Sequence, residues 1–207
     1  MKLVVFGATG GTGREIVTQA LEAGHEVTAV ARKHSPITIQ HKHLKVLQGD
    51  VLASETLLQA VKGQDAVIFA VGAADRSPTR VYSVGVMNVL LAMCDFHVRR
   101  LICVSASGLD PGSLIQKLIA KPLLWWIFKN GYTDMLHMEI IVKASSMDWT
   151  ILRPPRLTNG EHSGKYKVAV NKPLPNGWLL SRADLADYIV KHLHDPVIYR
   201  ATVDLAY

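Results

Sequence analysis

The chain has 207 residues, of which 49% are hydrophobic and 19% are charged, and its formal net charge is +6. These values fit one globular α/β domain with a substantial core and exclude a disordered chain. The basic residues are scattered and no aromatic-basic module accompanies them, so we expect no nucleic-acid partner. The positive charge instead suits a phosphate-rich small ligand, or it is a solvated basic surface.

Apolar, β-branched runs alternate with segments of helical periodicity along the chain. The expected strands cover 2–6, 26–31, 44–47, 65–71, 100–105, 149–152 and 199–206. The expected helices cover 12–23, 54–61, 79–96, 134–145 and 181–194. The last helix opens on a capping box formed by Ser181 and Asp184. A short strand pair is expected at 165–170.

The segment 109–131, between the fifth strand and the next helix, is rich in tryptophan. Its apolar pattern predicts a helix that is broken around Pro122 and lies near the substrate side. Trp125, Trp126 and Phe128 could cover a flat aromatic substrate, which would put Trp125 in the substrate pocket. They could equally pack on the core or form a dimer contact.

Strands separated by helices of this length form a parallel sheet that is covered on both faces. The sequence therefore predicts an α/β fold with a Rossmann-like, doubly wound parallel sheet, in a single NAD(P)-binding domain over 1–207. No repeat, low-complexity tract or linker divides the chain.

Cysteine usage and hydropathy indicate the compartment. Cys94 and Cys103 form no CxxC motif and lie in apolar stretches, so we expect buried thiols in a reduced, cytoplasmic protein. The initial apolar run is shorter than the apolar region of a signal peptide. The segment 114–128 contains two lysines and is too short to span a membrane, so no membrane partner is expected.

Four glycines crowd the junction between the first strand and the first helix, in the sequence VVFGATGGTG. Such a turn needs a positive φ at one glycine, close approach to a pyrophosphate at another and tight packing at the third. The free N–H groups of the helix that follows point at the phosphates, and threonine hydroxyls add donors. The residues expected to hold the pyrophosphate are Gly7, Thr9, Gly10, Gly11, Thr12 and Gly13. The alternative is a tight turn without a ligand.

The end of the second strand indicates which dinucleotide is preferred. An NAD-binding protein usually has an acidic residue here for the ribose 2′-hydroxyl, whereas this chain has Arg32 and Lys33. Two cations suit the 2′-phosphate of NADP(H), with surface charge as the alternative reading. Asp50 is placed to accept from an adenine amino group, with Val51 against the ring, and the small residues before and at Gly72 leave room for the ribose and pyrophosphate. Val71 belongs to the same strand end.

These motifs, together with VSASG and DWTILRPPRLTNG, resemble the atypical short-chain dehydrogenase/reductases. Within them the chain is similar to the NAD(P)H-binding, NmrA-like branch that includes the flavin and biliverdin reductases. The resemblance covers essentially the whole chain. It implies that Cys103, Ser105, Pro154, Pro155 and Arg156 surround the nicotinamide. Flavin reductases of this kind carry His directly after the Pro-Pro pair, and the arginine found here adds a cation suited to an anionic substrate.

The catalytic candidates are few. No tyrosine has Lys four residues later, so the Tyr-x-x-x-Lys pair that serves carbonyl reduction is missing. Ser105 and Arg156 are the catalytic candidates, with Ser107 and His137 as further residues of the substrate pocket. Ser105 could be a simple strand-end cap, and His137 could be merely exposed. We expect no metal site.

Glu139 and Lys143 are expected to form an i,i+4 surface pair. Hydride transfer to a flavin, biliverdin or quinone needs little more than a stacked acceptor, because the cofactor supplies the hydride. The sequence thus predicts an NADPH-dependent reductase of small planar acceptors, acting as a monomer or weak homodimer. The rival is a non-catalytic, NmrA-like NADP(H) sensor that acts through a protein partner.

Overall fold

The computed structural model describes residues 1–32, 37–107 and 121–207, and of 121–129 it describes the backbone alone. Its centre is an eight-stranded sheet in the order β3-β2-β1-β4-β5-β6-β10-β8. Seven strands run parallel: β1 (Lys2–Phe6), β2 (Glu26–Ala31), β3 (Leu44–Gln48), β4 (Ala66–Phe69), β5 (Arg100–Val104), β6 (Asp148–Arg153) and β10 (Ala201–Ala206). Only β8 (Lys167–Val170) is antiparallel, and it pairs with β10 at one edge. The predicted α/β, doubly wound sheet is confirmed.

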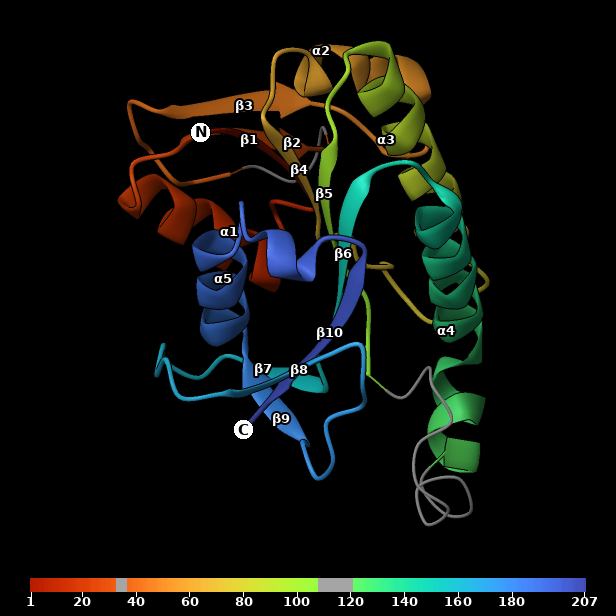
Figure 1. Ribbon diagram of the computed structural model, residues 1–207. Coiled ribbons are helices and arrows are strands. Elements are labelled where there is room, and N and C mark those ends of the chain that lie inside the picture. The colour runs from red at the N-terminus through yellow and green to blue at the C-terminus, as the bar shows by residue number, and fades with distance from the viewer. Residues whose placement is uncertain (33–36, 108–120) are drawn as a thin grey trace.

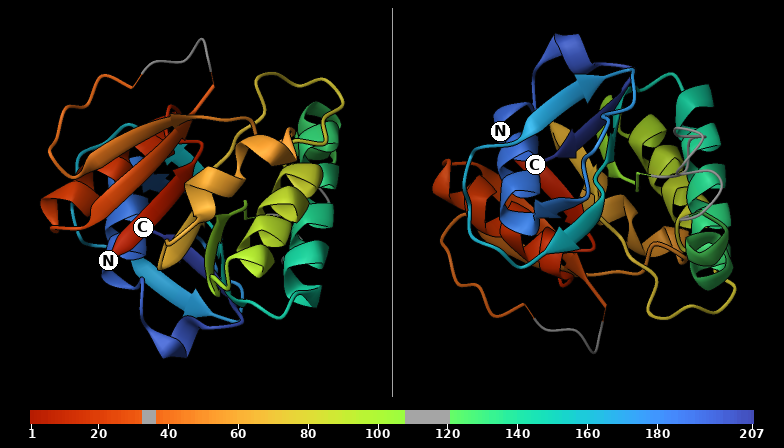
Figure 2. Two further views of the ribbon diagram at one scale, coloured as in Figure 1. Left: turned by 90° about the horizontal axis from the view of Figure 1, so that it is seen from above. Right: turned by 90° about the horizontal axis from the view of Figure 1, so that it is seen from below.

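Two helical layers cover this sheet, as Figures 1 and 2 show. On one face lie α1 (Gly11–Glu22) and α5 (Arg182–Lys191), and on the other lie α3 (Ser83–Asp95) and α4 (Lys121–Ala144). Alternate residues of a central strand serve the two faces, so that Val5 packs with the α1 side and Phe6 with the α3 side. The short elements are η1 (Ser54–Thr56), α2 (Leu58–Val61), η3 (Pro196–Ile198), β7 (Arg156–Thr158) and β9 (Leu179–Ser181).

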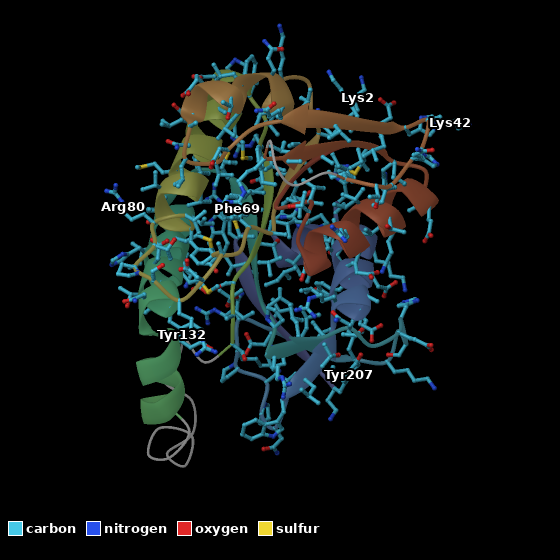
Figure 3. All side chains as sticks on the ribbon, turned by 180° about the vertical axis from the view of Figure 1, so that it is seen from behind. Lys2, Lys42, Phe69, Arg80, Tyr132 and Tyr207 are labelled. Atoms are coloured by element: carbon cyan, nitrogen blue, oxygen red, sulfur yellow. The ribbon has the colours of Figure 1, made fainter. Side chains whose placement is uncertain are left out.

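Burial follows this layering. Phe69, at the carboxyl end of β4, has no exposed surface and lies in the middle of the molecule in Figure 3, whereas Lys2 and Lys42 lie at its surface. Across the described part of the chain, no helix is both long and apolar enough to cross a membrane. The two cysteines differ, because Cys103 is buried but Cys94 is exposed on α3, so the expectation of two buried thiols is wrong for Cys94.

Two local predictions differ from the structure. A separate helix at 134–145 is wrong, because α4 is one helix from Lys121 to Ala144. The segment predicted to break around Pro122 lies largely in 108–120, outside the described residues. Instead of a strand pair at 165–170, one strand, β8, pairs with β10.

The predicted helix cap at Ser181 is confirmed, but the reciprocal half of the capping box does not form, because Ser181 N donates to the Tyr207 hydroxyl at 3.1 Å. The Asp184 N–H donates to Ser181 Oγ at 2.9 Å. The Asp184 side chain has no exposed surface and accepts from Ser163 N and Gly164 N at 2.8 Å each, from Ser163 Oγ at 2.7 Å and from Tyr207 OH at 2.6 Å. One carboxylate therefore holds the 163–164 loop and the last residue against α5. Burial raises the pKa of Asp184, but these hydrogen bonds together outweigh it and lower the pKa well below its usual range.

Replacing Asp184 by Asn should lower the free energy of unfolding at pH 7 by about 1–3 kcal/mol, because one oxygen that accepts two hydrogen bonds becomes a donor. A lowered folded-state pKa means that the carboxylate's contribution is complete above about pH 4 and is lost as the pH falls below it. The difference between wild type and variant in urea-induced unfolding should therefore narrow in acid. A difference that stays constant from pH 7 to pH 3 would contradict this role.

Candidate functional site

The carboxyl ends of β1, β2, β3 and β4 open onto one cavity of about 510 Å³. Ligands of doubly wound proteins bind at this edge of the sheet. The cavity brings together most of the residues predicted to hold the dinucleotide: Gly7, Thr9, Gly10, Arg32, Asp50, Val51, Val71 and Gly72. Gly11, Thr12 and Gly13 belong to the same turn but do not line the cavity.

Three glycines of the turn have different structural roles. Gly7 has φ +82°, and a Cβ there would lie 2.3 Å from the carbonyl oxygen of Ala70 on the neighbouring strand. A Cβ on Gly13 would lie 2.1 Å from the Gly7 oxygen, so this residue lets α1 pack on the turn. Gly10 meets only the Gly7 oxygen, at 3.3 Å, and lines the cavity. Position, packing and open approach are the three requirements of a pyrophosphate turn.

The amino end of α1 is electrostatically suited to an anion. Its N-cap, Gly10, has no side-chain cap hydrogen bond, and the first turn contains no acidic residue. The backbone N–H groups there have no intrahelical acceptors and carry the positive end of the helix dipole. Together with the open face of Gly10, this end of the helix fits the phosphates of a dinucleotide.

The side of the cavity predicted to take the adenosine is formed by the ends of β2 and β3. Arg32 is exposed and lines the cavity, whereas Lys33 lies outside the described residues. The Asp50 carboxylate accepts from Leu52 N at 2.9 Å, and Asp50 N donates to Thr56 Oγ1 at 3.0 Å, so its loop is held on both sides. Val51 is 7% exposed, which leaves a small apolar surface at the cavity wall.

Asp134, which the sequence reading did not single out, holds the far wall of the cavity. It lies on α4, is 4% exposed and accepts from Tyr82 N at 2.9 Å and from the Ser83 hydroxyl at the start of α3. Ala73 N, on the loop that lines the cavity, donates to the Tyr82 hydroxyl at 3.0 Å. The Asp134 carboxylate thus ties α4 to the start of α3, and the Tyr82 hydroxyl ties that start to the cavity loop. Because the two partners are 52 residues apart in the chain, no local pattern could reveal the contact.

A buried polar cluster lies where β5 and β6 end. Ser105 Oγ donates to Glu139 Oε1 at 2.8 Å, and Arg153 donates to both carboxylate oxygens, from Nε at 2.9 Å and from Nη2 at 2.5 Å. Glu139 is 2% exposed and Arg153 is 6% exposed. Lys143 lies 3.1 Å from Glu139, as the i,i+4 spacing predicts, but a surface pair is wrong, because the carboxylate is buried.

The other residues predicted around the nicotinamide differ in exposure. Cys103 has no exposed surface, and burial raises the pKa of its thiol, so its contact with the cofactor stays a prediction. Ser107 N donates to Pro154 O at 2.8 Å, which joins these two strand ends. Pro155 is half-buried and Arg156 is exposed at the start of β7. None of them lines the 510 Å³ cavity.

Two predicted pocket residues lie on α4. His137 is exposed, while its neighbours Met138 and Glu139 are buried, so its place in a substrate pocket stays a prediction. Trp125 belongs to α4, but only its backbone is described. The same holds for Trp126 and Phe128. Within the described residues, no three His, Cys, Asp or Glu side chains come together as metal ligands.

Arg182 is a cation that sequence reasoning missed. It is the first residue of α5, and a Cβ on Gly11 would lie 2.8 Å from its Nε, so its side chain lies against the glycine turn. Its Nη1 donates to Asn159 Oδ1 at 2.6 Å. The capping-box sequence predicted the helix start but gave no sign that this residue reaches the turn, which is far away in the chain.

Known proteins are similar to this chain in sequence and in fold. Residues 7–196 match the model of a family described as NAD(P)H-binding. The uncharacterized sugar epimerase YhfK of Bacillus subtilis is 25% identical over 210 residues, which cover 99% of this chain and 94% of that protein. Reductase pytE of Aspergillus terreus is 25% identical over 238 residues, covering 92% and 90%.

A short-chain dehydrogenase/reductase from Veillonella parvula, solved in complex with NADP, has the same fold. Its TM-score is 0.81 at 19% identity, over 100% of this chain and 94% of that one. Because the family model covers nearly all of the described fold, from the glycine turn to the end of α5, this chain belongs to the NAD(P)H-binding family.

Proposed function

We propose that the protein is an NADPH-dependent reductase that transfers hydride to a flavin or a similar planar acceptor, such as biliverdin or a quinone. The observation that carries this proposal is a dinucleotide cavity without a Tyr-x-x-x-Lys pair anywhere in the sequence. Carbonyl reduction uses such a tyrosine as a proton donor with a lowered pKa. Tyr82, which borders the cavity loop, instead has its pKa raised by burial, and so does Tyr132 on α4.

The names of the two relatives point in different directions, one to a sugar epimerase and one to a reductase. An epimerase must move a proton or hydride at a sugar carbon and return it, which calls for a positioned acid–base group. A reductase of a planar, conjugated acceptor needs no such acid–base group, because its main task is to orient the acceptor against the cofactor. The missing tyrosine–lysine pair therefore favours the reductase.

The chain's own residues divide the work of binding. When bound, the nicotinamide supplies the hydride. The α1 amino end and the open face of Gly10 would hold the pyrophosphate, and Arg182 adds a cation beside the same turn. Asp50 and Val51 would take the adenine, which directs the other end of the dinucleotide toward Ser105 and Pro154.

The rival function is a redox sensor that binds NADP(H) without turnover. The cavity and the missing Tyr-x-x-x-Lys pair are compatible with it. The buried Ser105–Glu139–Arg153 cluster is compatible with both functions, because its members satisfy one another's hydrogen bonds and both functions bind the same cofactor.

Steady-state oxidation of NADPH should separate the two functions. We expect NADPH to be oxidised faster than in the protein-free control with at least one of four acceptors: flavin mononucleotide, riboflavin, biliverdin or a quinone. The rate is measured as the decrease in NADPH absorbance. NADPH binding is measured in parallel by its fluorescence. Binding without turnover of any acceptor would reject the reductase and support the sensor.

Arg32 should set the preference for NADPH. A charge-assisted hydrogen bond to the 2′-phosphate is worth roughly 1.5–3 kcal/mol, and Arg32 is exposed, so we take the lower end. The variant Arg32→Ala should weaken NADPH binding about tenfold and leave NADH binding nearly unchanged. Arg14→Ala, an exposed arginine on α1 outside the cavity lining, is the matched control. Equal losses for both nucleotides would contradict the role of Arg32.

A further inference from the structure

The hydroxyl of Ser105 has its proton committed to a buried carboxylate. Ser105 Oγ donates to Glu139 Oε1 at 2.8 Å, while Arg153 donates to both Glu139 oxygens and Lys143 Nζ lies 3.1 Å from Oε2. A carboxylate between two cations offers acceptor oxygens only. The direction of the Ser105–Glu139 hydrogen bond is therefore fixed.

Because the Ser105 hydroxyl already donates its proton to Glu139, its oxygen can only accept a further hydrogen bond. A hydroxyl has one proton and two acceptor positions, and no donor within the described residues reaches Ser105 Oγ. Donation to a charged carboxylate makes the same oxygen a stronger acceptor. Ser105 is 5% exposed and directly follows the last residue of β5, at the edge of the sheet where ligands of doubly wound proteins bind.

Reversing the hydrogen bond would be costly. If the hydroxyl turned to donate to a ligand, Glu139 would lose one of its buried donors while remaining 2% exposed. The loss of one donor from a buried carboxylate is unfavourable, although Arg153 would still donate to both oxygens. Ser105 thus does not deliver a proton to a substrate, and a ligand group that offers only acceptors finds no partner there.

Resting on the proposed reductase, we infer that Ser105 accepts a hydrogen bond from an N–H group of a bound ligand, and that Glu139 is the positioning residue that sets this polarity. Two N–H groups in the proposed reaction have the required chemistry. One is the carboxamide NH2 of the nicotinamide, and the other is the ring N–H of a flavin or linear tetrapyrrole. An acceptor without N–H, such as a simple quinone, gains nothing from Ser105.

Paired ligands that differ in this one group test the inference. NADPH is compared with its reduced 3-acetylpyridine analogue, in which an acetyl group replaces the carboxamide and carries no N–H. Flavin mononucleotide is compared with its N3-methyl derivative. Dissociation constants are measured for the nucleotide pair and KM values for the flavin pair, each with wild type, Ser105→Ala, Ser105→Thr and Glu139→Gln. Ser146→Ala, an exposed serine after α4, is the control.

We expect Ser105→Ala to weaken the N–H ligand of one pair by about three- to tenfold and to leave its partner without N–H unchanged. Ser105→Thr keeps the hydroxyl and should therefore retain the wild-type preference for the ligand that has the N–H group. In Glu139→Gln the side-chain amide can donate to Ser105 Oγ and free the hydroxyl proton, so the preference should shift toward the ligand without N–H. A purely structural role for Glu139 would lower the affinity of both ligands without this shift.

The outcomes separate this inference from the proposed function. Discrimination within the nucleotide pair assigns the N–H donor to the cofactor, and it stands even if no flavin is reduced. Discrimination within the flavin pair assigns the donor to the acceptor. If Ser105→Ala affects both members of each pair equally, the inference is wrong, whether or not flavin is turned over. Thermal unfolding verifies that Glu139→Gln is folded, and the Ser105 variants decide the result if it is not.

Discussion

The close approach of Gly7 to Ala70 is the constraint on which the dinucleotide cavity depends. Gly7 begins the turn after β1 at φ +82°, and its missing Cβ allows the carbonyl group of Ala70, directly after β4, to lie beside it. Gly13 then packs on the Gly7 oxygen. Any side chain at either position would separate α1 from the sheet and move its amino end away from the cavity. Backbone sterics, rather than side-chain chemistry, therefore position the cofactor half of the site.

The other half of the site depends on buried carboxylates. Asp134 joins α4 to the start of α3, Glu139 joins α4 to β5 and β6, and Asp184 joins α5 to the end of the chain. Each is at most 4% exposed, and each accepts several hydrogen bonds. A buried carboxylate is tolerated only when its partners are in place, so these three residues specify how the helices sit on the sheet.

The sequence was sufficient to predict the features that depend on local pattern. The strand β1, the glycine turn and the cap at Ser181 have local signals, namely a β-branched run, spaced glycines and a capping box. Features formed by distant residues were not predictable in this way. The hydrogen bond from Ser105 to Glu139 joins residues that are 34 positions apart in the chain. Arg182 and Gly11, which are also in contact, lie in opposite halves of the chain. The burial of Glu139 was not predicted, because a glutamate four residues before a lysine is a typical pattern of an exposed helix face.

Strand geometry also explains why Cys103, which was predicted to contact the cofactor, is buried. Residues of a strand alternate between faces, so Cys103 and Ser105 project toward the same layer of helices. Only the residue beyond the strand end reaches the edge where a ligand binds, and Cys103 lies one step deeper, in the core. The same alternation sends Arg153 of β6 toward α4, where Glu139 meets both strands. The polarity of Ser105 is thus a consequence of strand register, because the register places a guanidinium and a hydroxyl on either side of one buried carboxylate.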